Sequence, residues 1–588
     1  MESLISDKDA MDPEVVVGGG DKSPARLWQG LPQSWALATF IVCSVAVTTW
    51  SCPECVAGLT VAALVISLRG SCSTLRQTGG GAWLLLLHQC CHLAGVVVGV
   101  RTTLQYMAGH SSWLTKQLIL SPHLASLGVL LFIITLHILG LERSRILRWG
   151  LLSCVPITLS LFLIGDMMLF SPERAKLIYD ELPTLSNVAN SAAFFTLVYS
   201  TSLSTYTPRE KITVTTLFPV KTMFVSCFFA IGFLTLGLVE ARDNSLSNEL
   251  LFFQVLTEWG SGAWRMLRGG LAVVCLTSLS LSLVEVVGMT QRGVVGVAGL
   301  VLPPQVARDH WWTGTQLTAL SITGLVSAVL LVLPLKSQIS LSSAAYLLSQ
   351  SCDIVFTIYS AYQPSFVPKN NGSQTGRVSY QLVSDTAALV EDTDSDSELS
   401  DDSGHSSDTD IDAAVHEYKQ TVKVARTRTI EEPNPSPTVR SARITILSLF
   451  AISSASVGMA AALAFNQVFS LAFTCLGILF FTHIISKQPQ ETDEQGLSVL
   501  SPWQPCLVLA LHLTLAALLL PQLWAPLIVW VCIGLVLWLV QKRRHWWHIQ
   551  TQLSRHAHRV RLPRPQLAQN FLTSYHKLST LNTVHVVR

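Results

Sequence analysis

Charged residues are scarce in this chain. They make up 13% of its 588 residues, against roughly 25% in an ordinary soluble protein, which argues against a series of soluble domains. The 39 Lys and Arg nearly balance the 37 Asp and Glu. The chain therefore has no overall basic field of the kind that nucleic-acid binding requires, and we expect no nucleic-acid partner.

Recognisable catalytic motifs are also missing. The sequence has no nucleophile elbow, phosphate-binding lysine loop or zinc-protease helix. Gly79, Gly80 and Gly81 follow no predicted strand, so we interpret them as a loop or hinge. Cys52 and Cys55 have no second Cys or His pair nearby, which makes a metal site there unlikely on spacing alone. We expect neither an enzyme nor a bound cofactor or metal.

Long apolar stretches are what the chain does contain. Half of the residues are hydrophobic, and a helix needs about 20 mainly apolar residues to cross a bilayer, where all its backbone groups must be paired internally. Fourteen stretches approach this requirement, so we predict an all-α polytopic membrane protein with about 14 transmembrane helices. They are residues 34–50, 54–69, 82–107, 122–141, 147–169, 187–205, 214–239, 266–290, 314–334, 339–361, 444–464, 467–485, 503–521 and 525–541.

The distribution of Lys and Arg sets the orientation, because positive residues stay on the cytoplasmic side. With both termini inside, 31 of the 39 basic residues fall on the cytoplasmic side. This predicts five regions along the chain. They are a cytoplasmic N-terminal segment (1–33), a ten-helix core (34–361), an acidic cytoplasmic loop (362–443), four C-terminal helices (444–541) and a basic cytoplasmic tail (542–588).

The loop is strongly acidic in its first half. Residues 385–412 contain eleven acidic residues and no Lys or Arg. They include too few apolar groups to offset the entropy of ordering the segment, so we expect it to be disordered. Four Ser or Thr residues have an acidic residue three positions later in the sequence and are candidate phosphorylation sites. These are Thr393, Ser395, Ser407 and Thr409. The alternative interpretation of the segment is an unmodified, solvated acidic spacer. The only glycosylation sequon, at Asn371, would face the cytosol and stay unmodified.

Ionisable groups at membrane depth are few, and each suggests a site by default. Asp353 lies within the tenth predicted span and is the deepest carboxylate. His88 and His92 stand four residues apart in the third span, so they share one helix face. That face could hold a metal ion, but it has no further ligands in sequence, and helix packing with hydrogen-bonded imidazoles is the favoured interpretation.

The C-terminal region has a familiar organisation. Lys487-Gln488-Pro489-Gln490 is followed by Ser501-Pro502-Trp503-Gln504-Pro505 and the turn Gln522-Leu523-Trp524-Ala525-Pro526. With the Tyr362-Gln363-Pro364 turn and the long loop after ten spans, it resembles the cationic amino acid transporters of the amino acid-polyamine-organocation (APC) superfamily. The resemblance implies a LeuT-like inverted-repeat core with extra C-terminal helices, and an amino acid or related small organic amine as substrate.

The substrate site departs from that family. Its members bind substrate between two helices broken at glycine, the first and the sixth, yet neither corresponding span here contains glycine. Tyr199, Ser200 and Thr201 stand where the family shows a break, and no carboxylate is present there for a cationic substrate. Hydroxyls and one carboxylate are the remaining candidates for substrate binding. The full set is Ser44, Thr48, Tyr199, Ser200, Thr201, Ser278 and Asp353.

Two functions from different classes remain open. The architecture favours a secondary amino acid transporter in the plasma membrane, with loose tyrosine sorting patterns leaving endolysosomal membranes as an alternative. The glycine-free first and sixth spans favour a transport-inactive relative that acts as sensor, scaffold or subunit through cytoplasmic partners of its acidic loop and basic tail. Lys542-Arg543-Arg544-His545-Trp546-Trp547 could bind anionic lipid, or could simply anchor the topology.

Overall fold

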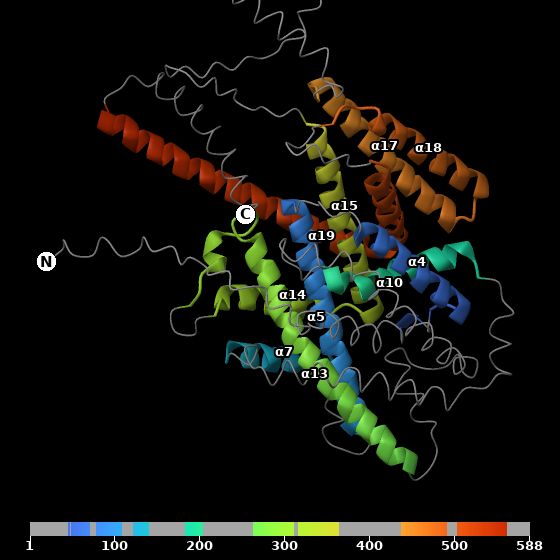
Figure 1. Cartoon of the computed structure of the whole chain (residues 1–588). Helices are drawn as coiled ribbons and strands as arrows, with labels where there is room; N and C mark the ends of the chain where they lie inside the picture. The colour runs from blue at the N-terminus through green and yellow to red at the C-terminus, as the bar shows by residue number, and fades with distance from the viewer. Residues whose placement is uncertain are drawn as a thin grey trace, which may run out of the picture.

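The structure is a computed structural model, and it describes nine stretches of the chain. They are residues 45–46, 49–70, 78–108, 122–139, 183–203, 263–310, 315–363, 437–490 and 502–560. Within these stretches the secondary structure is helical, apart from turns and one isolated bridge between Ala298 and Leu302 (Figure 1). The predicted all-α class is therefore confirmed for the described residues.

Ten α-helices and one short 3-10 helix make up the described part. The α-helices are α4 (Cys52–Gly70), α5 (Gly79–Ala108), α7 (Pro122–Ile138), α10 (Leu185–Leu203), α13 (Ala263–Val297), α14 (Leu317–Leu330), α15 (Leu335–Ala361), α17 (Val439–Ala464), α18 (Val468–Ser486) and α19 (Trp503–Val560), with η4 at Pro304–Ala307. Each overlaps a stretch predicted to span the membrane, except for η4. Predicted spans 147–169 and 214–239, and most of 34–50, lie outside the described residues.

Among the described residues, five helical stretches are long and apolar enough to cross a membrane. They are Gly79–Met107, Ala272–Val297, Val439–Ala464, Val468–Ser486 and Trp503–Arg544. This supports a multi-pass membrane protein.

The last two predicted spans require a correction. A turn at Gln522–Pro526 was expected between residues 503–521 and 525–541, but α19 runs without interruption from Trp503 to Val560 with Pro521 and Pro526 inside it. Figure 1 shows that α19 bends instead: one part lies near α17 and the last part extends away from the other helices. Proline removes one backbone donor and kinks a helix without having to end it. Helix α19 also continues 19 residues into the predicted tail.

Local sequence accounts for several helix ends. Pro53 and Glu54 open α4, and the Glu54 carboxylate accepts a hydrogen bond from the Ser51 backbone N–H at 3.1 Å. A capping box between Thr438 and Ser441 starts α17. Between α17 and α18, Asn466 takes a left-handed backbone with φ of 53°, which asparagine tolerates better than most residues. These two helices consequently form a tight antiparallel hairpin.

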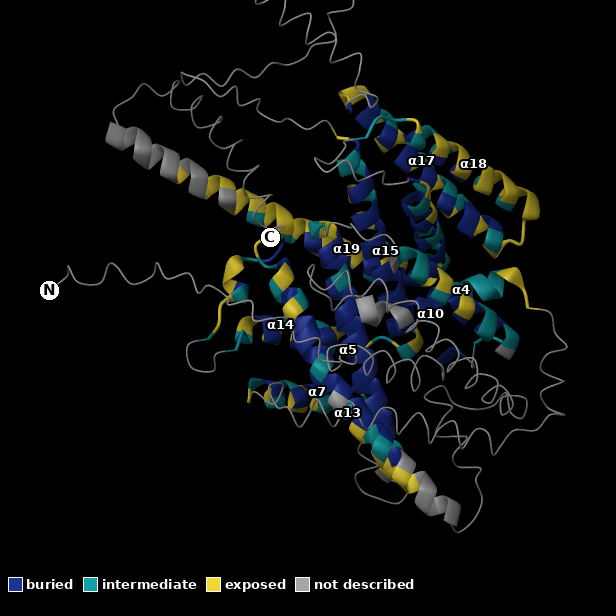
Figure 2. Cartoon of the chain, viewed as in Figure 1, coloured by how far each residue is buried: buried dark blue, intermediate teal, exposed yellow. Residues whose placement is uncertain are grey.

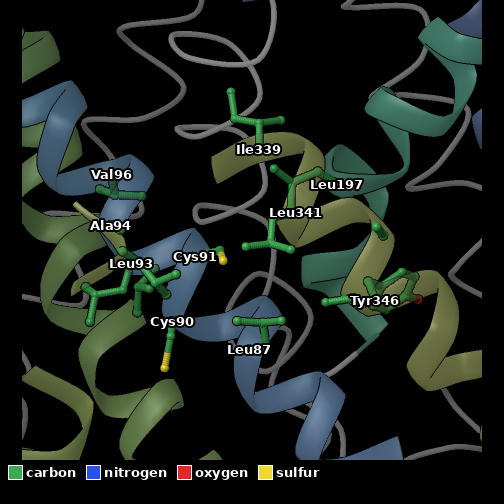
Figure 3. Packing of buried hydrophobic residues seen from close by; sticks show 14 of the residues in the cluster. Leu87, Cys90, Cys91, Leu93, Ala94, Val96, Leu197, Ile339, Leu341 and Tyr346 are labelled. Carbon is green, nitrogen blue, oxygen red and sulfur yellow. The ribbon is translucent and has the colours of Figure 1, made fainter. Parts of the chain in front are cut away.

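Helix α5 is at the centre of the structure. It packs extensively against α15 and α13, and 94% of its most apolar window is buried. Figure 2 shows α5 and α15 mainly in the colour of buried residues. The apolar packing includes Leu87, Leu93 and Val96 of α5, Leu341 of α15 and Leu197 of α10, which meet in Figure 3. Cys90 and Cys91 point in different directions within this packing.

The peripheral helices expose large apolar side chains. Only 17% of the apolar window of α18 is buried, and Phe469, Phe473 and Phe480 are exposed on it. Helix α19 likewise exposes Ile528 and Val536. A contiguous apolar surface of this kind needs a lipid or protein environment, which agrees with helices that face a bilayer.

Two indole rings join α5 to α19. Trp83 and Trp530 stack with centroids 4.5 Å apart and planes 12° apart. The Trp83 indole N–H donates to the Trp530 carbonyl at 3.0 Å, and the Trp530 indole N–H donates to the Trp83 carbonyl at 3.1 Å. Gly534 lies directly against the Trp83 ring. We call this arrangement the tryptophan clasp, and it holds residues 447 positions apart together.

Candidate functional site

Polar side chains on the buried side of α5 form the strongest candidate site. His88 and His92, one turn apart as predicted, have ring centroids 6.2 Å from each other. The Tyr346 ring of α15 lies 5.3 Å from that of His88. All three side chains are at most 5% exposed. We call His88, His92, Ser342 and Tyr346 the polar seam.

His88 is tied to α15. Its Nδ1 lies 2.9 Å from the Ser342 hydroxyl and 3.1 Å from the Ser342 carbonyl oxygen. The Ser342 hydroxyl also lies 3.1 Å from the His88 carbonyl oxygen, to which it donates. The interpretation of His88 as a packed, hydrogen-bonded imidazole is therefore confirmed. Among the described residues, no group of three or more His, Cys, Asp or Glu could hold a metal ion.

Several buried polar atoms of α5 and α15 have no partner in the described part of the chain. His92 Nε2, Gln89 Oε1 and the Tyr346 hydroxyl have no hydrogen-bond partner among the described residues. An unpaired polar group in a dry interior costs roughly 1–3 kcal/mol, and native structures keep few of them. These atoms therefore keep unused hydrogen-bonding capacity in the interior of the protein.

Helix α13 lines the other side of α5 and runs antiparallel to it. The Thr290 hydroxyl lies 3.4 Å from the Gln89 carbonyl, and a Cβ on Gly293 would lie within 1.9 Å of Gln89 Oε1. Further along the same helix, Ser278 and Ser282 are buried with hydroxyls that have no described partner. Ser278 was predicted as a substrate-binding residue, and it lies on a helix that packs against α5.

A second polar contact joins α13 to α7. His137 Nε2 lies 2.7 Å from Gln291 Oε1, and both side chains are buried. His137, in the last turn of α7, is therefore packed between helices.

Asp353 has a structural contact. Its Oδ1 accepts hydrogen bonds from the Thr78 backbone N–H at 2.8 Å and the Thr78 hydroxyl at 3.0 Å. Thr78 immediately precedes α5, so the carboxylate of α15 caps the positive end of the α5 dipole. A Cβ on Gly81 would meet Asp353 Oδ1 at 2.4 Å, which explains the glycine there. The carboxylate predicted as a substrate ligand thus fixes the start of the helix that carries the seam.

The remaining predicted substrate residues are placed only in part. Tyr199, Ser200 and Thr201 lie on α10, which is continuous from Leu185 to Leu203, so the backbone is unbroken where the family would have its second break. Their side chains lie outside the described part of the structure. Ser44 and Thr48 lie outside the described residues, as do the phosphorylation candidates Thr393, Ser395, Ser407 and Thr409.

A buried carboxylate joins α4 to α10. Glu54 is 6% exposed, and its Oε1 accepts hydrogen bonds from the Asn187 amide at 2.8 Å and the Thr184 hydroxyl at 3.2 Å. A Cβ on Gly58 would overlap the Ser191 side chain, so these two helices approach closely. The sequence analysis considered only the neighbouring Cys52 and Cys55 and missed this carboxylate.

The polar contacts between α15 and the α5 segment were also missed. Ser342, Ser349 and Asp353 contact α5, and their spacing of seven and four residues places them on one helix face. That spacing could have indicated a polar face toward α5. It was obscured by neighbouring hydroxyls such as Ser343, which instead donates to the Phe194 carbonyl of α10 at 3.0 Å.

Comparisons with known proteins give no family assignment. No protein-family model matches the chain, and no characterised protein matches it significantly.

Proposed function

We propose that this chain is a secondary transporter of an amino acid or related small organic amine, working by alternating access between two bundles of helices. The proposal includes a multi-pass helical bundle with a core similar to that of the APC superfamily. The observation that carries it is the polar seam at the centre of an apolar helical protein. Intramembrane polar and ionisable residues commonly mark a substrate pathway.

The seam also indicates the kind of substrate. His92 and Tyr346 offer neutral donors and acceptors, and the seam contains no carboxylate. The nearest one along α15, Asp353, is engaged with Thr78. We therefore favour a neutral, zwitterionic substrate over a cationic one. Because α10 is unbroken, side chains of α5 and α15 would replace the exposed backbone groups that the family uses to hold an amino acid.

Flux through the purified protein tests this function. The full-length chain is reconstituted into liposomes, and counterflow of labelled neutral amino acids, Arg and Lys is measured against empty liposomes. We expect flux of at least one neutral amino acid. A His92→Gln variant should raise the KM for this substrate, whereas His123→Gln on α7 removes a histidine outside the seam and should leave it unchanged. Absence of flux for every amino acid would refute transport.

The unbroken α10 favours a second candidate. In the family, the corresponding helix is broken and exposes the backbone groups that bind the substrate. A chain in which this helix is continuous would keep the architecture but lose this substrate site, and would act as a sensor, scaffold or subunit. Protein that is monodisperse and melts cooperatively, yet shows no flux of any amino acid, would support this candidate. Misfolded protein is thereby distinguished from folded protein that has no transport activity.

A further inference from the structure

The end of α19 has the features of a membrane-surface binding site. We call residues Lys542–Thr551 the basic arm. Within it, three cations and two indole rings are exposed side by side: Lys542, Arg543, Arg544, Trp546 and Trp547. Among the described residues, no acidic side chain pairs with Arg543 or Arg544. The positive charge of the arm is therefore available to a partner.

The preceding residues place the arm at a bilayer surface. From Ile533 to Val540, α19 exposes large apolar side chains such as Val536 and Leu539, and its membrane-compatible stretch ends at Arg544. The first cation, Lys542, has its ammonium 4.9 Å from the centre of the Trp538 ring, a cation–π contact. Tryptophan followed by basic residues is typical of the boundary between hydrocarbon and headgroups.

One face of α19 at the arm borders an open cavity. Five residues at spacings of three, one, three and four positions share this helix face. They are Val540, Arg543, Arg544, Trp547 and Thr551. They line an open cavity of about 530 Å³. Two guanidinium groups beside an indole ring and an aliphatic side chain match a ligand that has both a phosphate and an apolar part.

We propose that this face binds the headgroup of an anionic phospholipid in the leaflet on the tail side. The two arginines contact the phosphate, and Trp547 and Val540 contact the upper part of the acyl chains. The chain's own acidic segment, residues 385–412, has the right charge but only four apolar aliphatic side chains beyond alanine, Leu389, Val390, Leu399 and Ile411. The exposed indole rings and the position next to the membrane-compatible stretch favour a lipid. The inference does not depend on transport.

Lipid binding to the delipidated full-length protein tests this inference. Native mass spectrometry measures the apparent Kd for phosphatidylserine and for phosphatidylcholine in the wild type and in the Arg543→Ala/Arg544→Ala variant. Each cation near an anionic surface contributes about a fivefold factor in affinity. We therefore expect the double variant to bind phosphatidylserine about 25-fold more weakly, with little change for phosphatidylcholine.

A matched variant controls for the loss of two charges. Arg440 and Arg443 are exposed at the start of α17, and Arg440→Ala/Arg443→Ala should retain phosphatidylserine affinity within about twofold. Arg543→Lys/Arg544→Lys should retain most of it, because the charge remains. Equal losses in the two alanine variants, or equal affinity of the wild type for both lipids, would overturn the inference. So would phosphatidylserine binding that appears only after residues 385–412 are deleted.

Discussion

The tryptophan clasp offers the sharpest test of how α19 packs on α5. Substituting Gly534 by alanine adds one methyl group on the buried side of α19. That Cβ would lie 2.3 Å from Trp83 Nε1 and 2.6 Å from Trp83 Cδ1, distances at which atoms cannot remain. The Trp83 ring is rigid, stacked on Trp530 and hydrogen-bonded to its carbonyl, so the alanine must displace the ring or separate the helices.

The expected cost follows from the contacts that are lost. Losing the Trp83 hydrogen bond costs about 1 kcal/mol, and losing the indole stack costs about 1 kcal/mol. Overpacking adds about 1–3 kcal/mol. The better helix propensity of alanine returns about 1 kcal/mol. The net destabilisation is therefore about 2–4 kcal/mol, which lowers the Tm by several degrees.

The assay is thermal unfolding of the purified protein in detergent, followed by a thiol-reactive dye. Buried free cysteines such as Cys90 and Cys275 become accessible on unfolding. Gly477→Ala on α18 is the matched control, because no atom lies within 4 Å of its added Cβ, and its Tm should not fall. In a Trp83→Ala background, Gly534→Ala should cost less than in the wild type, since its obstacle has gone. A Gly534→Ala protein that melts at or above the wild-type Tm would refute the reasoning.

Three further predictions concern the helix contacts and the topology. Asp353→Asn should lower stability by about 1–2 kcal/mol in the same thermal assay, because the charged cap on α5 is lost; an unchanged Tm would argue against this capping role. Glu54→Ala should destabilise by about 2–3 kcal/mol, because it leaves the donors of Thr184 and Asn187 unpaired, and Asn187→Ala should cost less; equal costs would contradict a shared carboxylate. Asn371 should carry no glycan in cells, and a mobility shift after glycosidase treatment would overturn the predicted orientation.

Composition and periodicity determined the class of this protein and most of its helices. Apolar runs such as residues 82–107 and 339–361 correspond to α5 and α15, because a helix that crosses lipid must satisfy its backbone internally and therefore needs a continuous apolar stretch. This rule depends on the local sequence alone and requires no information about which helices pack together. The prediction of a turn at Gln522–Pro526 was wrong, because Pro521 and Pro526 lie within α19, which bends without ending there.

Only the tertiary structure decided which polar residues meet. Asp353 was a candidate substrate ligand in sequence, but its carboxylate caps α5 through Thr78, 275 positions away. His88 and Ser342 are 254 positions apart, and the two rings of the tryptophan clasp are 447 apart. Hydropathy reports how well a residue tolerates lipid and not which helix it faces. The pairing of helices, which makes one buried polar group a cap and leaves another unpaired, is set by packing across the whole chain.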